Sequence, residues 1–232
     1  MRVLAIGDIH GCLRAFDLLL DMAQPTKGDL LVTLGDYIDR GPDSAGTLHR
    51  LIGLRKRCKH IAILGNHDIM MLQSRRDRGA FDNWFACGGE ETLQSYGADL
   101  RWNLFQDSVP TRHWNFLQNR CVPYFEIDTH FFVHANVFPE MPLQEQPEFM
   151  LYWECFDADL SRPHESGKVM VCGHTAQKTG APLAVPHAIC IDTWVYGNGW
   201  LTCLDVRTGK YWQAKQTGEQ REGWLQPDER VL

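Results

Sequence analysis

Short apolar runs alternate with amphipathic stretches through the first 75 residues of the chain. Apolar runs of strand length occupy positions 3–6, 30–34 and 61–64. Between the first two runs, one face of a helix is formed by Leu13, Phe16, Leu20 and Ala23. A second helical stretch follows Pro42 and extends to about Arg55. The order strand, helix, strand, helix, strand predicts right-handed crossovers and a largely parallel sheet in this half.

Strand patterns dominate the second half of the chain. We expect a β-hairpin at 124–127 and 130–133, with its turn at Asp128–Thr129. Further strands are expected at 168–172, 188–191, 200–204 and 211–214. The segment after Gln216 is polar and is predicted to be frayed. Two sheets that face each other, with helices outside, fit this order of elements.

The segment between the two halves, residues 75 to about 122, mixes aromatic and charged residues without a clear period. Short helices are expected here, one from Glu90 to Tyr96 and another that begins near Pro110. The segment is either a cap-like helical insertion that shapes access to a site or a set of helices that only covers a sheet edge. The pattern does not separate the two.

Composition narrows the class of protein. With 232 residues the chain is long enough for one substantial core, so we expect a single domain over 1–232. A net charge of −6 argues against a surface built mainly for nucleic acid. There is no apolar run of about 20 residues, and the chain opens directly into a strand, so we expect a cytoplasmic protein without a membrane partner. The eight cysteines form no CxxC pair, and those in apolar runs (Cys172, Cys190 and Cys203) are expected to be buried thiols.

Polar residues follow the predicted strands at five places. Gly-Asp-Ile-His-Gly (7–11), Gly-Asp-Tyr-Ile-Asp-Arg-Gly (35–41) and Gly-Asn-His-Asp (65–68) end the first three strands, and His134 and Gly-His-Thr (173–175) end two later ones. An α/β sheet places its ligands at such strand ends. Oxygen and imidazole donors without thiolate suit manganese, iron(II), zinc or similar ions. The five loops therefore predict one metal site, whose excess positive charge would favour a phosphate.

These five blocks, in this order and spacing, resemble the signature of the calcineurin-like metallophosphoesterases. More narrowly, residues 2 to 214 resemble the PPP-type phosphatases of bacteria and phages, a group that includes symmetrical diadenosine tetraphosphatases. The resemblance implies an α/β fold, a four-layer αββα sandwich of two mixed β-sheets flanked by helices. It also implies a centre of two divalent ions, with Mn²⁺ expected first and Fe²⁺, Zn²⁺, Ni²⁺ or Co²⁺ as alternatives.

The resemblance also assigns roles to individual residues. The first metal would be held by Asp8, His10 and Asp36, and the second by Asp36, Asn66, His134 and His174. His67 would be the general acid, Asp39 would orient it, and Arg40 would clamp the phosphate through its planar fork. Asn66 would lie within reach of the substrate as well as of the metal.

Two departures from the family pattern limit this transfer. His134 is followed by Ala135 where the protein phosphatases usually have glycine. Many bacterial relatives also have an arginine just after the tryptophan of a later Leu-x-Trp segment, whereas Trp153 is followed by Glu154. Either Arg162 supplies that second phosphate clamp, or the clamp is missing. Glu154 is either a surface residue or a group that selects a substrate with a cation or a sugar hydroxyl.

Three functions follow as hypotheses. The first is a phosphoric monoester hydrolase that acts on phosphoserine or phosphothreonine in proteins with a metal-activated water and a histidine acid. The second is a symmetrical diadenosine tetraphosphate hydrolase, for which Tyr196-Gly197-Asn198-Gly199 is a weak indication. The third, a non-catalytic phosphate-binding module, is disfavoured because both the ligands and the acid are present. Expected partners are a phosphoprotein or a small phosphoester, and the oligomeric state stays open.

Overall fold

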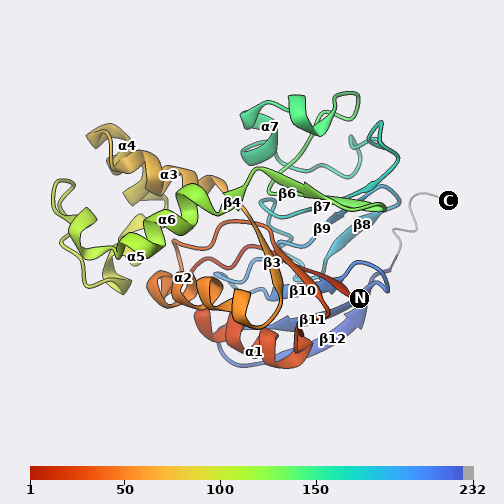
Figure 1. Cartoon of the computed structure of the whole chain (residues 1–232), viewed down its shortest axis with the longest axis horizontal. Helices are drawn as coiled ribbons and strands as arrows, with labels where there is room; N and C mark the ends of the chain where they lie inside the picture. Colours follow the sequence, from red (N-terminus) through yellow and green to blue (C-terminus); the bar gives the residue numbers. More distant parts are fainter. Residues whose placement is uncertain (227–232) are drawn as a thin grey trace.

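Seven strands form the larger of two sheets in the computed structural model, which describes residues 1–226. In spatial order they are β12 (Gln220–Trp224), β11 (Lys210–Ala214), β10 (Leu201–Asp205), β1 (Val3–Ile6), β2 (Leu30–Thr33), β3 (Lys59–Ile63) and β4 (Cys121–Val122). Strands β1, β2 and β3 are parallel, as predicted, and β4 pairs parallel to β3. The carboxyl ends of β1, β2 and β3 therefore meet at one edge of the sheet (Figure 1).

The smaller sheet has five strands. Their order is β5 (Tyr124–Glu126), β6 (His130–Val133), β7 (Val169–Cys172), β9 (Ala188–Cys190) and β8 (Leu183–Val185). Strands β5 and β6 form the predicted antiparallel hairpin, and β6, β7 and β9 are parallel. The loops after β6 and β7, which carry His134 and His174, consequently lie at the same end of this sheet.

The two sheets pack face to face through an apolar layer, as the strand patterns predicted. Inward-facing side chains of both sheets form it, among them Val3, Val32, Phe132, Val171 and Ile191. Helices α1 (Leu13–Ala23) and α2 (Ser44–Gly53), with the short helix η1 (Leu54–Lys56), lie outside the larger sheet. The outer face of the smaller sheet is covered more thinly, by η4 (Leu143–Glu145), α7 (Glu148–Tyr152) and loops. The four-layer αββα arrangement is confirmed.

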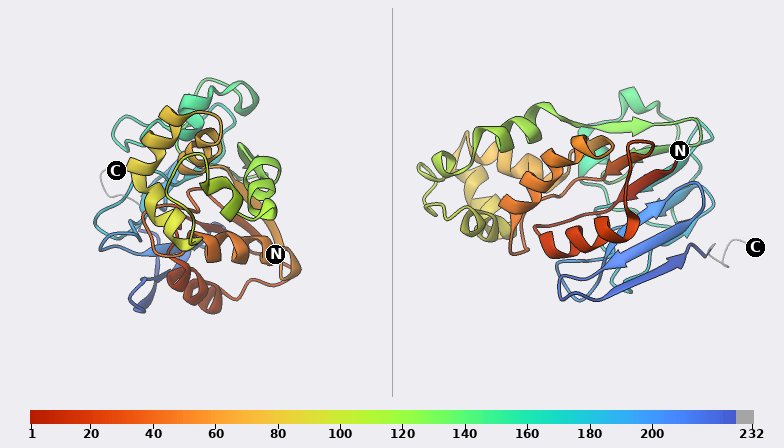
Figure 2. Two further views of the ribbon diagram at one scale, coloured as in Figure 1. Left: turned by 90° about the vertical axis from the view of Figure 1, so that its left-hand side faces the viewer. Right: turned by 60° about the horizontal axis from the view of Figure 1, so that its bottom comes forward.

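Most of the segment 75–122 is helical and projects at one end of the molecule, next to α3 (Asn66–Ser74), and its last two residues form β4 (Figure 2). It comprises α4 (Arg78–Trp84), the π-helical turn η2 (Phe85–Gly89), α5 (Glu90–Ser95), η3 (Phe105–Ser108) and α6 (Thr111–Asn119). Its core is an aromatic cluster, in which the Phe105 ring lies 5.2 Å from Phe81, 5.7 Å from Trp84 and 6.2 Å from Trp114. We refer to residues 75–119 as the cap.

Three features differ from the sequence prediction. The prediction of a frayed segment after Gln216 is wrong for 220–224, because β12 pairs with β11 along five residues and Arg221 donates to Gln213 Oε1 at 2.6 Å. Residues 227–232 of that predicted tail lie outside the described residues. Helix α7 and the short strands β4 and β8 were not predicted, since each is too short to show a period.

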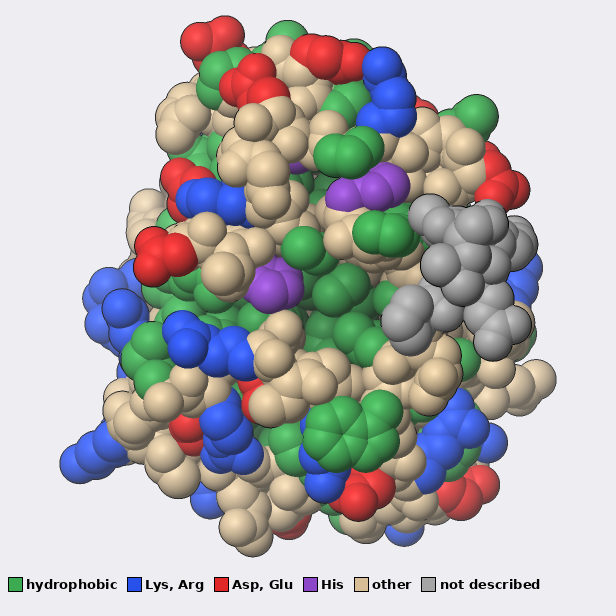
Figure 3. Space-filling view, turned by 90° about the vertical axis from the view of Figure 1, so that its right-hand side faces the viewer, with side chains coloured by type: hydrophobic (Ala, Val, Ile, Leu, Met, Phe, Trp, Pro, Cys, Tyr) green, Lys and Arg blue, Asp and Glu red, His purple; other side chains and the backbone are tan. Residues whose placement is uncertain are grey.

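The surface at the end opposite the cap shows Lys, Arg, Asp and Glu interspersed around a hollow of hydrophobic side chains (Figure 3). None of the helices between residues 1 and 226 has the length and apolar character needed to cross a membrane. All eight cysteines fall within this range and are free thiols, with Cys172, Cys190 and Cys203 buried as predicted.

Candidate metal centre

The loops after the strands hold their polar residues in an unusual backbone conformation. Seven non-glycine residues of the described chain have positive φ, and five of them are candidate site residues: His10, Asp36, Asp39, Arg40 and His174. Such a conformation costs free energy for residues with a Cβ, and it persists where the surrounding structure enforces it. The signature glycines allow close approach, since a Cβ on Gly65 would collide with Asp36 and one on Gly173 with Asp8. The loops are thus built to bring these side chains together.

The predicted second metal position is a convergence of acceptor atoms. His134 donates through Nδ1 to the Leu34 carbonyl at 2.8 Å, which leaves its Nε2 as an acceptor. His174 donates through Nε2 to the Trp153 carbonyl at 3.1 Å, which leaves its Nδ1 as an acceptor. Both free nitrogens face Asn66 Oδ1, at 2.9 and 3.1 Å, and Asp36 Oδ1 lies 3.4 Å from His134 Nε2. Lone pairs of imidazole, amide and carboxylate groups thus converge on one position, where a bound cation would accept them.

The predicted first metal position has the same character. His10 donates through Nδ1 to the Ile38 carbonyl at 2.9 Å, so its Nε2 is an acceptor; this atom lies 3.5 Å from Asp36 Oδ2. Asp8 is buried beside them and accepts from the His174 backbone N–H at 3.0 Å. Asp36 therefore presents one carboxylate oxygen to each position, as expected of a bridging ligand.

The electrostatics of these groups fit bound divalent cations. Burial lowers the pKa of His134 to about 4 and the pKa values of His10 and His174 below the ordinary value, so all three imidazoles are neutral at pH 7, as ligands must be. Burial, and then the nearby Asp192 and Asp36, raise the pKa of Asp8 well above its usual range. A cation in the site would reverse this penalty, because its charge favours the carboxylate form. The residues present therefore fit the metal ions that the sequence predicted.

His67 and Asp39 form a buried pair beside the ligands. His67 Nδ1 lies 2.7 Å from Asp39 Oδ2, and the His67 ring packs edge-on to the His10 ring at 4.9 Å between centroids. Trp84 Nε1 donates to both oxygens of Asp39, at 3.0 and 2.9 Å, and Thr92 Oγ1 donates at 2.6 Å. The Asp39 carboxylate thus fixes the orientation of the His67 ring, and a ring nitrogen of His67 lies within 4.8 Å of the ligand atoms of His10 and Asp36.

Arg40 lies at the solvent side of the centre. Its guanidinium donates to His10 Nε2 at 3.0 Å and stacks on the Tyr196 ring, 4.5 Å from the ring centroid. Tyr196 also packs edge-on to His10, with ring centroids 4.7 Å apart. An exposed, stacked guanidinium next to the ligands is placed to bind a phosphate through two parallel hydrogen bonds.

Arg162 is not brought to the centre. Its guanidinium pairs with Glu140 at 2.7 Å and lines a pocket on the outer side of the smaller sheet. The lining of that pocket contains none of the candidate ligands. The prediction that Arg162 supplies a second phosphate clamp therefore finds no support in its position, and Glu154 lines the same pocket.

Four further residues contribute to the centre and escaped the sequence analysis. Asp68 is buried and accepts from the backbone N–H groups of Gly65, Asp36 and Tyr37, which ties the second loop to the third. Asp192 is buried close to Asp8, and burial raises its pKa to about 6. The other two are Trp84 and Thr92 of the cap. Asp68 could have been found from its place in the Gly-Asn-His-Asp block, whereas no sequence pattern marks Trp84 or Thr92.

Comparison with known proteins gives a consistent result. Residues 1–197 match the model of the calcineurin-like phosphoesterase family. A symmetrical bis(5'-nucleosyl)-tetraphosphatase of Buchnera aphidicola is 45% identical over 73 residues, which are 31% of this chain and 26% of that protein. The enzyme of the same name from Ralstonia nicotianae is 47% identical over 68 residues, 29% of this chain and 23% of that protein. The matched part thus spans only about a quarter of these relatives.

Solved structures resemble the whole chain at lower identity. One, provisionally named a diadenosine tetraphosphatase, has a TM-score of 0.66 and 21% identity and covers 97% of this chain and 94% of its own. A serine/threonine phosphatase from Saccharomyces cerevisiae has a TM-score of 0.59 and 16% identity and covers 98% and 82%. Both support the fold alone. The family match over residues 1–197, together with this fold and the clustered ligands, shows that the chain belongs to the calcineurin-like phosphoesterases, a family that implies divalent metal ions.

Proposed function

We propose that this chain is a dimetal phosphoester hydrolase whose preferred substrate is a dinucleoside tetraphosphate. The observation that supports the hydrolase is the convergence of acceptor atoms: ring nitrogens of His134 and His174 face Asn66 Oδ1, and Asp36 Oδ1 lies 3.4 Å from His134 Nε2. Acceptor atoms that face one another destabilise the folded state unless a cation lies between them. We therefore propose that these side chains bind an ion.

The residues around the ions supply the rest of the chemistry. Two divalent cations, when bound, would neutralise charge on the phosphate and lower the pKa of the attacking water. Arg40 would bind the non-bridging phosphate oxygens in the orientation that attack requires. His67, held by Asp39, would give its Nε2 proton to the leaving oxygen as the bond to phosphorus breaks.

The choice of substrate class rests on the named relatives. The curated relatives reported above are symmetrical tetraphosphatases, and this favours the dinucleotide over the phosphoprotein that the sequence motifs alone put first. The choice of metal rests on the donor types instead. Because the candidate ligands are carboxylate, amide and imidazole groups, Mn²⁺ is the first ion to test.

Specificity constants decide between the two substrates. Metal-free protein is loaded with Mn²⁺, and kcat/KM is measured for diadenosine tetraphosphate, a phosphoserine peptide and para-nitrophenyl phosphate. We expect diadenosine tetraphosphate to be preferred over the peptide and to give two molecules of ADP. A higher constant for the peptide would return the protein-phosphatase hypothesis to first place. No turnover of any of the three, with Mn²⁺ shown to be bound, would contradict the hydrolase itself.

A further inference from the structure

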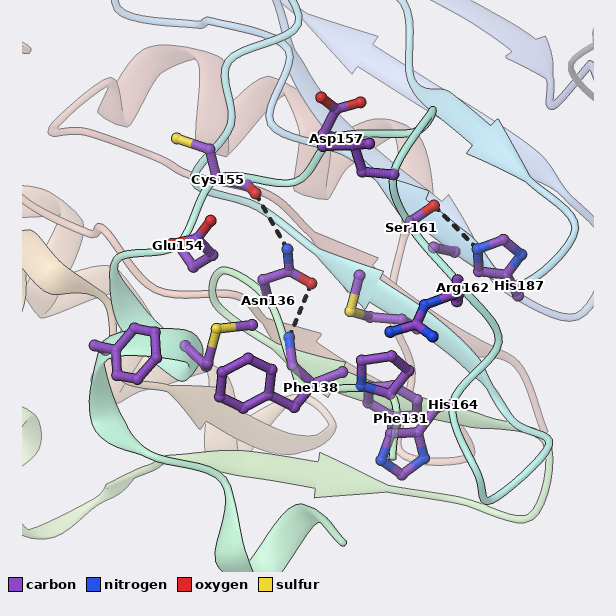
Figure 4. Close-up of a pocket in the computed structure, with 17 residues that line it drawn as sticks. Phe131, Asn136, Phe138, Glu154, Cys155, Asp157, Ser161, Arg162, His164 and His187 are labelled. Carbon is purple, nitrogen blue, oxygen red and sulfur yellow. Dashed lines mark hydrogen bonds between the residues drawn. The ribbon is translucent and has the colours of Figure 1, made fainter. Parts of the chain in front are cut away.

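The outer face of the smaller sheet carries a pocket next to the metal centre. Its volume is about 320 Å³, at the lower end of the range for small-molecule sites. Figure 4 shows Asn136 in its middle, with Glu154 and Cys155 on one side and Arg162, His164 and His187 on the other. Strands β6 and β7 contribute Phe131 and Met170 to its floor.

The pocket gathers exposed apolar side chains. Seven large hydrophobic residues of the described chain are exposed, and three of them line this pocket: Phe138 (38%), Phe149 (50%) and Leu160 (78%). The rings of Phe138 and Phe149 pack edge-on at 5.7 Å and leave aromatic surface open to solvent. Clustered exposed apolar groups mark a binding surface, and open ring faces suit a flat heterocycle.

The charges in the pocket indicate a neutral ligand part with hydroxyl groups. Arg162, the single Lys or Arg of the lining, is already paired with Glu140, whereas the lining contains the carboxylates of Glu154 and Asp157. The Glu154 side chain is exposed and makes no hydrogen bond or ion pair with the described residues. Such a carboxylate repels a phosphate but accepts hydrogen bonds from two neighbouring hydroxyls, as on a ribose.

A single loop joins the pocket to the metal centre. The Trp153 carbonyl accepts from His174 Nε2 at 3.1 Å, and the next residue is Glu154. Phe156 N–H donates to Thr175 Oγ1 at 2.8 Å, so the other end of the loop is fixed beside His174 as well. Asn136, in the middle of the pocket, is two residues beyond His134 and donates to the Cys155 carbonyl at 3.1 Å. The loop that lines the pocket with Glu154 and Cys155 is therefore the same loop that contacts His174 of the metal centre.

We infer that this pocket binds one nucleoside of a dinucleoside polyphosphate, with the base on Phe138 and Phe149, the ribose hydroxyls on Glu154, and the phosphates leading to the metals. The inference rests on the proposed function and adds to it the residues that select the nucleoside.

The test compares two pocket variants, Phe149→Ala and Glu154→Gln, with Glu148→Gln as the matched control. Glu148 is exposed on α7, the helix that also contains Phe149, and it does not line the pocket. For Phe149→Ala we expect the ratio of kcat/KM for diadenosine tetraphosphate to kcat/KM for para-nitrophenyl phosphate to fall about tenfold, since an aromatic platform for a base is lost. Glu154→Gln should lower this ratio for diadenosine tetraphosphate. It should not lower the corresponding ratio for the 2′,3′-dideoxy analogue of diadenosine tetraphosphate, which lacks the ribose hydroxyls. Glu148→Gln should leave both ratios as in the wild type.

A binding measurement separates the pocket from the reaction. In metal-free protein we expect NMR saturation transfer to adenosine, and its loss in Phe149→Ala with an unchanged melting temperature. If the wild type hydrolyses diadenosine tetraphosphate but both pocket variants keep the wild-type ratios, the pocket assignment is wrong and the proposed function stands. If the wild type hydrolyses para-nitrophenyl phosphate alone and gives no transfer to adenosine, both are wrong.

Discussion

Hydrogen bonds to backbone carbonyls decide what the histidines of the centre can do. His10 and His134 donate through Nδ1, and His174 through Nε2, so each turns its other ring nitrogen toward Asp36 or Asn66. His67 differs, because its Nδ1 partner is the carboxylate of Asp39. A carboxylate partner in place of a carbonyl is an arrangement that suits a general acid, so we predict that His67 is the acid and the other three histidines are ligands.

Replacing His67 with Asn tests that separation. Turnover of a substrate with a poor leaving group, such as phosphoserine or a nucleotide, should fall by a factor of about 100 to 10,000. The loss should be smaller for para-nitrophenyl phosphate, whose leaving group needs little protonation. The metal content, measured by atomic spectroscopy, should stay at the wild-type value. Because His67 also lies within ligand distance of His10 and Asp36, loss of metal in the variant would make it a ligand instead of the acid.

At the scale of helices and strands, the cap contacts residues of the metal centre. The sequence left open whether residues 75–122 shape the site or only cover a sheet edge. Helix α4 supplies Trp84 and helix α5 supplies Thr92, and both donate to Asp39. The Gly88 carbonyl of the π-helical turn accepts from the Arg40 N–H at 3.2 Å. The cap therefore contacts both the carboxylate of Asp39 and the backbone of Arg40, and we propose that it positions these residues.

The Trp84→Phe variant tests this role of the cap at a residue that is not a candidate metal ligand. The variant keeps the aromatic packing against Phe81 and Phe105 but removes the donor to Asp39, which leaves a buried carboxylate with fewer partners. We expect a loss of about 1–3 kcal/mol in the free energy of unfolding. We also expect a fall in kcat that is larger for poor leaving groups than for para-nitrophenyl phosphate. Phe81→Leu is the control for packing, and an equal effect on both substrate types in Trp84→Phe would contradict a role through His67.

A second inter-element contact makes stability depend on pH. Asp29 accepts hydrogen bonds from the Arg2 guanidinium and from Thr26, and these, the Arg2 contact foremost, hold the pKa of Asp29 below its ordinary value. The Arg2 guanidinium also donates to the Ala23 carbonyl at 2.9 Å, so the pair ties the end of α1 to the starts of β1 and β2.

Because the folded pKa is depressed, the Asp29 contribution is present above the unfolded value of about 4 and is lost as the pH falls below it. We expect urea unfolding to show Asp29→Asn less stable than the wild type by about 1–2 kcal/mol at pH 7, with the gap narrowing below about pH 4. A gap of the same size at pH 7 and pH 3 would mean that the charge of Asp29 plays no part.

At the scale of the whole molecule, the centre lies where the two sheets meet. Asp8, Asp36 and Asn66 follow strands of the larger sheet, and His134 and His174 follow strands of the smaller one. An ion held by both groups links the sheets directly, and its binding free energy adds to the stability of the fold.

Removal of the metals should therefore lower the melting temperature. Buried carboxylates at Asp8, Asp36 and Asp192 then repel one another without a compensating charge, and ion binding at 100 to 1,000 times Kd is worth about 3–4 kcal/mol. Calorimetry with and without chelator measures the shift. Asp36→Asn is the control, since it weakens both metal positions and should make the melting temperature insensitive to chelator. A wild-type curve unchanged after verified metal removal would contradict the link between the sheets.

The sequence by itself determined the succession of strands and helices in the first half and the sandwich class, and it predicted the residues of the candidate metal centre. Each of these depends on short-range information: apolar runs predict strands, and glycine with Asp, Asn or His after a strand marks a ligand loop. The helix faces of α1 and α2 were readable for the same reason. The structure brings His10 and Asp36 together, and Asp36, His134 and His174, while their roles with bound metal stay predictions.

Only the tertiary structure decided how distant segments support that centre. Trp84 and Thr92 contact Asp39 from 45 and 53 residues away, and nothing in their local pattern differs from that of core residues. β12 looked like a polar tail because its stability comes from pairing with β11, not from apolar periodicity. The partner of Arg162 and the pocket around Glu154 likewise depend on how loops fold over the smaller sheet. The local sequence pattern determines which functional groups each loop contains. Packing between segments far apart in the sequence determines how these groups are oriented and how accessible they are.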